Sequence, residues 1–301
     1  MTAASDSHTR QPVYVPSPIK RSRRNRAEMD AIRVAIYDVL VAESPMTVRQ
    51  VFYRLVSSGA IAKTEMEYKQ TVVRLLTEMR REREIPFHWI ADNTRWMRKP
   101  RTYHSLRSML KITKDTYRRE LWSNQPAYVE VWLEKDALAG VLYQETEPWD
   151  VPLMVTRGYS SISYLYAAAE AMADIGKPVF VYYFGDHDPS GRDITRATEA
   201  GLREFAGDAE IHFERVAVTE EQITALHLPT RPTKKTDSRC KSFHGGSVEV
   251  DAIPPAVLRA IARECIQAHI DERRLQQIQL VEELERATLE RILQSPELQL
   301  S

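Results

Sequence analysis

One segment of the chain, residues 177–196, restricts the fold more than any other, because strand-forming residues give way within it to carboxylates. Residues 179–184 are all β-forming and mostly apolar, a pattern typical of a strand covered on both faces. Asp186 and Asp188 follow two positions apart, so in extended backbone their side chains point the same way. Residues 193–205 have helical spacing, which completes a strand, an acidic loop and a helix.

These two aspartates are candidate metal ligands. No cationic residue stands between them in this segment, and carboxylates that point the same way repel each other unless a cation such as Mg²⁺ neutralises them. In open α/β sheets the carboxyl ends of the strands are also where ligands bind. The alternative is that Asp186 and Asp188 only cap the following helix and bind nothing.

A second acidic loop repeats the arrangement earlier in the chain. Residues 127–133 form another strand-like run, which ends at Glu134 and Lys135 and precedes a helical segment, 137–144. If both strands belong to one sheet, Glu134 joins the two aspartates in a three-carboxylate Mg²⁺ site of the kind used in phosphoryl transfer. Pairing of Glu134 with Lys135 is the simpler alternative. A further strand over 153–156, followed by an alanine-rich helix, favours an α/β fold with a mostly parallel sheet.

Charge is distributed unevenly along the 301 residues, although the formal net charge is zero. Residues 1–124 contain 24 Lys and Arg against 13 Asp and Glu, whereas residues 125–301 contain 18 against 29. The length allows two domains, so this asymmetry predicts a basic, polyanion-binding domain in front of an acidic, metal-binding one. Residues 1–26 are polar, contain three prolines and end in a basic run, and we expect them to be a disordered arm.

The first domain, over 27–124, has the pattern of a winged helix. An apolar stripe predicts a first helix from residue 27, a threonine N-cap introduces a second over 48–57, and 65–83 predicts a third. The basic and aromatic residues 87–99 then predict a short hairpin. Three helices followed by a hairpin are typical of winged-helix DNA-binding modules, which place the third helix in the major groove and the wing on the backbone.

Tyr53 is the candidate nucleophile of the second helix. The apolar residues of this helix fall on one side of a helical wheel, and Tyr53 lies roughly 130° from the centre of that stripe. Arg49, one turn earlier, lies on the same flank. An arginine beside an accessible phenol can hold a phosphate and favour the phenolate as a nucleophile. The alternative is a partly exposed tyrosine that only shields the helix.

The second domain, over 125–301, continues beyond these motifs. Residues 228–239 form a proline-punctuated basic loop that either closes over DNA or simply connects elements at the surface. Residues 248–252 predict a short edge strand with two more acids. Residues 255–293 predict helices that pack on the sheet and extend towards a partner subunit.

Cysteine usage and hydropathy exclude several classes of protein. Cys240 and Cys265 have neither metal-binding spacing nor a disulfide framework, which fits a reducing cytosol. No apolar run approaches the length of a membrane span, and the amino terminus lacks the apolar core of a signal peptide. The sequence therefore predicts a soluble, cytoplasmic protein without a membrane partner.

Two motifs resemble those of a known family of DNA-cleaving enzymes. Residues 133–137 and 185–191, Leu-Glu-Lys-Asp-Ala and Gly-Asp-His-Asp-Pro-Ser-Gly, look like the Toprim signature, a glutamate after one strand and Asp-x-Asp after another. Residues 48–54, Val-Arg-Gln-Val-Phe-Tyr-Arg, are similar to the nucleophile helix of the topoisomerase VI A subunit and of the meiotic double-strand-break transesterase. The motifs occur in the family's order, winged helix first and Toprim second, and the resemblance covers roughly residues 27–270. The chain looks most like the standalone A-subunit-like proteins of this family.

The resemblance implies a role for each candidate residue. Tyr53 would attack a DNA phosphodiester and become linked to the 5′ end, and Arg49 would steady that phosphate. Glu134, Asp186 and Asp188 would hold Mg²⁺. A homodimer acting in the nucleoid would make two staggered nicks, and hence a double-strand break in DNA.

Other functions stay open on the residues alone. The chain has no Gly-rich nucleotide motif, so strand passage as in a topoisomerase would need a separate ATPase subunit. A Toprim nuclease in which water attacks would keep the metal ligands but would not need Tyr53. A non-catalytic DNA-binding protein would use the acids only as helix caps.

Overall fold

The computed structural model describes residues 24–91, 100–232, 243 and 246–295. Three sequence predictions fall wholly or partly outside these residues: almost all of the basic arm, residues 92–99 of the hairpin, and the basic loop from residue 233.

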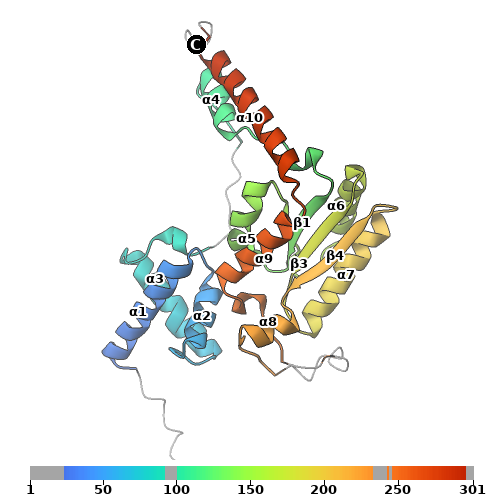
Figure 1. The fold of residues 1–301 in the computed structure, drawn as a ribbon. Coiled ribbons are helices and arrows are strands. Elements are labelled where there is room, and N and C mark those ends of the chain that lie inside the picture. The colour runs from blue at the N-terminus through green and yellow to red at the C-terminus, as the bar shows by residue number, and fades with distance from the viewer. Residues whose placement is uncertain (1–23, 92–99, 233–242, 244–245, 296–301) are drawn as a thin grey trace, which may run out of the picture.

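The chain is an α/β protein in which N-terminal helices precede a four-stranded parallel sheet (Figure 1). The α-helices are α1 (Arg26–Glu43), α2 (Val48–Ser57), α3 (Arg74–Arg81), α4 (Leu106–Thr116), α5 (Ala139–Thr146), α6 (Ile162–Ile175), α7 (Pro189–Phe205), α8 (Glu220–Ala225), α9 (Pro255–Gln267) and α10 (Glu272–Leu293). The strands are β1 (Tyr128–Leu133), β2 (Leu153–Val155), β3 (Val179–Phe184) and β4 (Ile211–Ala217). A π-helix, η1 (Glu67–Val73), leads into α3, and the 3₁₀ turns are η2 (Phe87–Trp89), η3 (Leu121–Asn124), η4 (Asp136–Leu138), η5 (Glu147–Trp149) and η7 (Val250–Ala252).

The strands lie in the order β2-β1-β3-β4, and every neighbouring pair is parallel. This confirms the predicted parallel sheet and the three strands expected from apolar runs. The central strands β1 and β3 end level with each other, because Leu133 pairs with Phe184. Strand β4 was not predicted, because this edge strand alternates buried and exposed positions over its first half and has no continuous apolar run.

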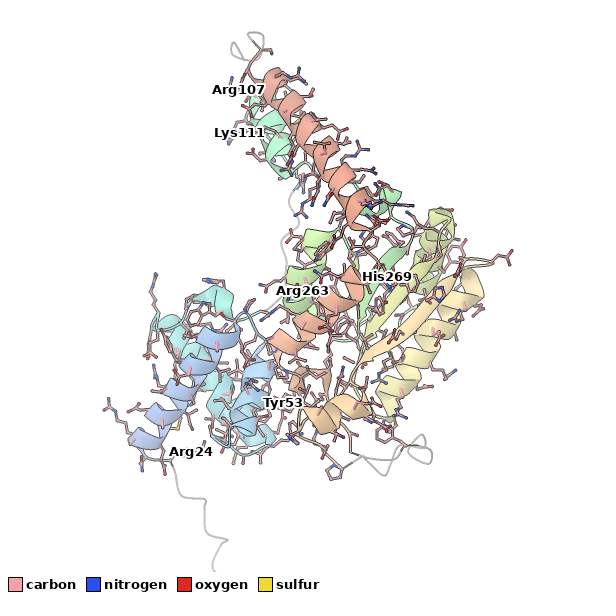
Figure 2. All side chains as sticks on the ribbon, in the orientation of Figure 1. Arg24, Tyr53, Arg107, Lys111, Arg263 and His269 are labelled. Atoms are coloured by element: carbon pink, nitrogen blue, oxygen red, sulfur yellow. The ribbon has the colours of Figure 1, made fainter. Side chains whose placement is uncertain are left out.

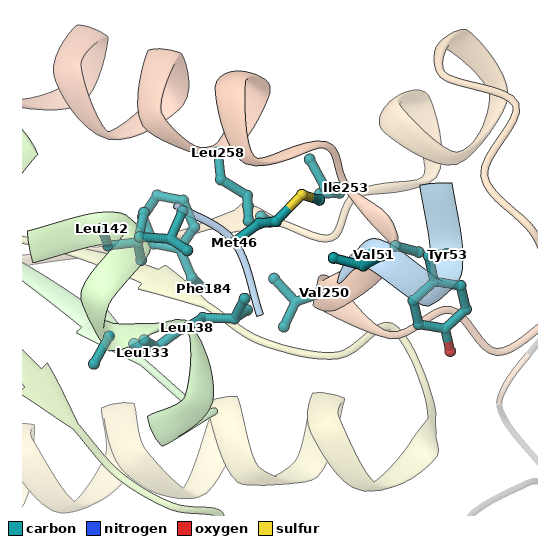
Figure 3. Close-up of a cluster of buried hydrophobic side chains, with 14 of the residues drawn as sticks. Met46, Val51, Tyr53, Leu133, Leu138, Leu142, Phe184, Val250, Ile253 and Leu258 are labelled. Carbon is teal, nitrogen blue, oxygen red and sulfur yellow. The ribbon is translucent and has the colours of Figure 1, made fainter. Parts of the chain in front are cut away.

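Alternate residues of the sheet enter two separate hydrophobic cores. Trp132 and Tyr183 pack with α6 and α7 on one face. Leu133 and Phe184 belong to the other core, which includes α5 and α9 and continues without a break into α1, α2 and α3. Figure 3 shows this second core as one cluster that runs from Phe184 to Val51. The N-terminal helices and the sheet therefore share a core and are packed as one body.

Two segments predicted to be β-structure form short helical turns instead. At the start of the predicted hairpin, η2 occupies residues 87–89, and Ile90 makes a single parallel bridge to Met46. Residues 248–252 begin with a bridge from Val248 to His187 and then turn into η7. The edge-strand prediction was wrong because the backbone N–H of Val250 donates to the Asp186 carboxylate rather than to a neighbouring strand.

The C-terminal helices separate after α9. Helix α9 packs on α5 and the sheet as predicted, but α10 turns away at its N-cap, Asp271, and lies against α4 in an arm that projects from the body (Figure 1). The hydroxyl of Tyr117, just after α4, donates to Glu285 of α10 at 2.6 Å. None of the helices described by the structure combines the length and apolar character required to cross a bilayer.

Candidate active site

The parallel pairing of β1 with β3 brings two predicted metal ligands together. Glu134 follows β1, and its backbone N–H donates to the carbonyl oxygen of Phe184, the last residue of β3, at 2.9 Å. The backbone N–H of Asp186 in turn donates to Oε2 of Glu134 at 3.0 Å. Glu134 and Asp186 therefore lie side by side at the carboxyl edge of the sheet.

Two glycines allow the acidic loop to close tightly. A Cβ atom on Gly185 would lie 2.7 Å from Oε2 of Glu134, and one on Gly191 would lie 2.1 Å from the carbonyl oxygen of Asp186. Both distances are too short for a real side chain, and the second involves backbone, which cannot swing aside. The glycines of this motif therefore have a steric role in placing the carboxylates.

Asp188, the third predicted ligand, caps α7. Its Oδ1 accepts a hydrogen bond from the backbone N–H of Gly191 at 2.7 Å, and its backbone is extended, as is usual at an N-cap. The capping alternative is thus realised for Asp188. This bond uses one oxygen of a carboxylate whose negative charge still reaches Glu134 and raises its pKa.

A cation lies beside Asp186, contrary to the expectation from the local sequence. Nζ of Lys135 is 3.0 Å from Oδ1 of Asp186, 2.6 Å from Oδ2 of Asp251 and 3.1 Å from Oε2 of Glu249. Lys135 thus pairs with these three acids and not with Glu134. The sequence did not reveal this cluster because two of the three partners, Asp251 of η7 and its N-cap Glu249, lie more than a hundred positions after Lys135.

Burial disfavours the charged forms of the carboxylates at this edge of the sheet. Burial, together with the nearby charge of Asp186, raises the pKa of Glu134 to about 7. Burial also raises the pKa of Asp186, although Lys135 opposes that effect. Within the described residues, no three His, Cys, Asp or Glu side chains are already gathered as a metal-binding group. The donor chemistry nevertheless fits Mg²⁺, because adjacent buried carboxylates are the oxygen ligands that a hard cation stabilises.

Tyr53 is buried, so the expectation of an accessible tyrosine was wrong. Its side chain is part of the hydrophobic core, and only 2% of the residue is exposed. The wheel placed Tyr53 outside the apolar stripe correctly, but α2 is covered on more than one side: it contacts α1, η1 and also η7. Figures 2 and 3 show Tyr53 where α2 meets the rest of the body, with its hydroxyl pointing away from the labelled apolar side chains.

Charged groups surround the buried phenol. Burial raises the pKa of Tyr53, whereas the positive charges of Arg231, Lys135 and Arg49 lower it. Asp251 acts in the opposite direction to these cations. The Tyr53 hydroxyl therefore lies within electrostatic reach of the cluster around Lys135, even though the residue is almost entirely covered.

The guanidinium of Arg49 packs on the ring of Tyr68, a residue that no sequence motif indicated. The centre of its guanidinium lies 4.6 Å from the ring centroid of Tyr68, a cation–π contact, and its NH1 is 3.6 Å from Oε2 of Glu249. Tyr68 belongs to the π-helix η1, a rare conformation that is frequent at functional sites. The sequence offered no signal for this pairing, because the helical spacing of 65–83 predicted a regular α-helix.

These groups meet around one cavity of about 550 Å³ between the N-terminal helices and the sheet edge. It contains Arg49 and Tyr68 on one side and Glu134 and Lys135 on the other, but Tyr53 is not among its lining residues. Further charged residues of both signs also line it: Arg80, Asp136, Arg157, Glu249 and Asp251. The cavity therefore brings the predicted phosphate-binding arginine to Glu134, one of the three predicted metal ligands; Asp186 and Asp188 are not among its lining residues.

A search of protein-family models finds none that matches the chain, and a search of curated proteins finds no match either.

Proposed function

We propose that this protein is a Mg²⁺-dependent enzyme that cleaves double-stranded DNA by tyrosine transesterification, with a winged-helix domain followed by a Toprim domain, as in the topoisomerase VI A subunit. The observation that carries the proposal is the cavity shared by Arg49 and Glu134. It places a helix bearing an arginine and a tyrosine against an edge where two carboxylates are held together.

In the proposed reaction, Oη of Tyr53 attacks the phosphorus of a DNA phosphodiester. A phosphorus–oxygen bond forms to the tyrosine and the bond to the 3′ oxygen breaks, which leaves the 5′ phosphate linked to protein. The phenolic proton passes to water, and the 3′ oxygen takes a proton from water. Because Tyr53 is 2% exposed, DNA binding has to uncover its hydroxyl before attack.

The surrounding residues would support this step electrostatically. Arg49 would hold the phosphate, since a guanidinium forms charge-assisted hydrogen bonds with phosphate oxygens. Glu134, Asp186 and Asp188 would hold Mg²⁺, which supplies charge neutralisation for the phosphate and the leaving oxygen when it is bound. A second copy of the chain would cut the other strand, so the active form would be a homodimer acting on nucleoid DNA. Strand passage would need a separate ATPase subunit.

One observation favours a second candidate function, hydrolysis by a Toprim nuclease. The burial of Tyr53 and its raised pKa are unfavourable for a nucleophile, whereas Glu134 lines the open cavity. In that reaction water would attack the phosphorus and no protein would remain attached to DNA.

Quenching the reaction in detergent tests both candidates. Purified protein is incubated with internally labelled supercoiled DNA and Mg²⁺, and wild type is compared with Tyr53→Phe and with Tyr143→Phe, a half-exposed tyrosine of α5 used as the matched control. We expect label to stay with wild type and Tyr143→Phe but not with Tyr53→Phe. Cleavage by all three without attached protein would instead establish hydrolysis, and no cleavage by any of them would contradict both enzymatic functions.

A further inference from the structure

Three cations from separate parts of the chain converge on the carboxylate of Glu249. Lys135, after β1, is 3.1 Å away, and Arg49, on α2, is 3.6 Å away. Arg231 also pairs with Glu249. The Glu249 side chain is only 14% exposed, so it lies beneath these groups rather than among solvent-exposed surface pairs.

The two arginines depend on this single carboxylate. Among the residues that the structure describes, Arg49 and Arg231 each have Glu249 as their acidic partner, whereas Lys135 also pairs with Asp186 and Asp251. Arg231 is fixed through its backbone, which exchanges hydrogen bonds of 2.9 and 2.8 Å with Ser247. The cationic groups are thus positioned from different elements and share one small anion.

A phosphate has the chemistry to replace that anion. Guanidinium and ammonium groups that bind a carboxylate bind phosphate oxygens in the same way, and Arg is especially suited to phosphate geometry. The position is also appropriate for the reaction, because the charges of Arg231, Lys135 and Arg49 each lower the pKa of the Tyr53 phenol. A phosphate held among them would therefore lie near the proposed nucleophile.

We propose that Arg49, Lys135 and Arg231 form the binding site for a backbone phosphate of DNA, and that the Glu249 carboxylate occupies this site until DNA displaces it. The identity of the ligand as DNA rests on the proposed function. The role of Glu249 as an internal competitor rests on the ion pairs alone.

If the Glu249 carboxylate competes with DNA for the three cations, removing its negative charge should make the protein bind DNA more tightly. Glu249→Gln keeps the shape of the side chain but removes the charge that holds the three cations. We expect its affinity for a short labelled duplex, measured by fluorescence anisotropy without Mg²⁺ at fixed salt, to rise about 3- to 10-fold, the effect of one charge contact. Arg231→Gln should weaken binding by a similar factor and reduce the salt dependence by about one phosphate contact.

Matched variants separate this effect from a general change in net charge. Glu220→Gln also removes one acid that pairs with an arginine, Arg192 at 2.6 Å, but it lies outside the cluster. It should leave the affinity within about 2-fold of wild type. In the double variant Glu249→Gln with Arg231→Gln, most of the increase in duplex affinity expected for Glu249→Gln should disappear. Equal tightening by Glu220→Gln, or no tightening by a folded Glu249→Gln, would overturn the inference.

Three further outcomes distinguish the ligand and the proposed function. Inorganic phosphate is offered as a competitor, and retention of free phosphate without any binding of the duplex would overturn DNA as the ligand. If the variants change duplex binding as expected but wild type never forms a covalent adduct, the proposed transesterification fails while the phosphate site stands. If adducts form and binding ignores Glu249 and Arg231, the inference fails alone.

Discussion

The acidic edge after β1 and β3 and the buried tyrosine of α2 are held in place by different interactions. At the edge, Glu134 and Asp186 are placed by backbone hydrogen bonds that continue the pairing of two strands. On α2, Tyr53 is placed by packing, because the residue is 2% exposed and α2 contacts α1, η1 and η7. We therefore expect that removing the charge of Glu134 or Asp186 lowers the stability of the fold less than removing the side-chain volume of Tyr53.

The largest expected effect is therefore on stability, at Tyr53. Tyr53→Ala removes a buried aromatic ring and should lower the free energy of unfolding by about 3–5 kcal/mol. Tyr53→Phe keeps the ring and removes a hydroxyl that makes no hydrogen bond within the described part of the chain, so it should change stability by less than about 1 kcal/mol. Urea denaturation followed by circular dichroism measures both. A large loss in Tyr53→Phe would show that the hydroxyl holds the fold, and that its loss of activity is no evidence of nucleophilic chemistry.

At the acidic edge the largest effect should be on cleavage. Asp186→Asn keeps an oxygen that can accept from Val250 but removes the negative charge, so we expect Mg²⁺-dependent cleavage to fall about 100-fold or more. Asp193→Asn, on the surface of α7, is the matched control and should retain activity. The rate of conversion of supercoiled DNA measures both variants. If Asp186→Asn cleaves DNA as fast as wild type, Asp186 is not a ligand in the proposed metal site.

A smaller effect concerns pH. Glu134 has a pKa of about 7 in the folded chain against an ordinary value of 4.5, so between these values the folded state binds more protons than the unfolded state. The free energy of unfolding should therefore decrease as pH rises from about 4.5 to 7, by an amount on the order of 2 kcal/mol.

Denaturation at pH 5 and pH 8 should show this decrease in wild type without Mg²⁺, and Glu134→Gln should lack the part that Glu134 contributes. Mg²⁺ should offset the decrease above pH 7, because it binds the ionised carboxylate. Identical pH dependence in wild type and Glu134→Gln would contradict the raised pKa.

The smallest expected effect is on duplex binding, through the contact between Arg49 of α2 and Tyr68 of η1. Tyr68→Phe keeps an aromatic face under Arg49 and should leave duplex binding within about 2-fold, whereas Tyr68→Leu loses the cation–π contact and should weaken binding about 2- to 5-fold. Anisotropy with the labelled duplex compares them. Equal weakening by both variants would assign the effect to the Tyr68 hydroxyl rather than to its ring.

Much of this architecture could be predicted from short patterns. The apolar runs predicted β1, β2 and β3, the parallel arrangement placed Glu134 level with the aspartates, and the threonine cap gave the bounds of α2. Strand β4 escaped prediction because it has no continuous apolar run, and the turns η2 and η7 escaped because they are short and their conformation depends on neighbours. The winged-helix identity of the first domain and the role of each candidate residue stay predictions.

The sequence by itself determined that Glu134 and Asp186 belong to one edge of the sheet, because strand-like runs separated by helices favour parallel strands whose carboxyl ends meet. Only the tertiary structure decided which groups surround them. The contacts of Lys135 with Asp251, of Arg49 with Tyr68 and Glu249, and the covering of Tyr53 all join residues far apart in the chain. Such contacts depend on how η7 and η1 pack against α2, and packing of this kind leaves no periodic trace in the sequence.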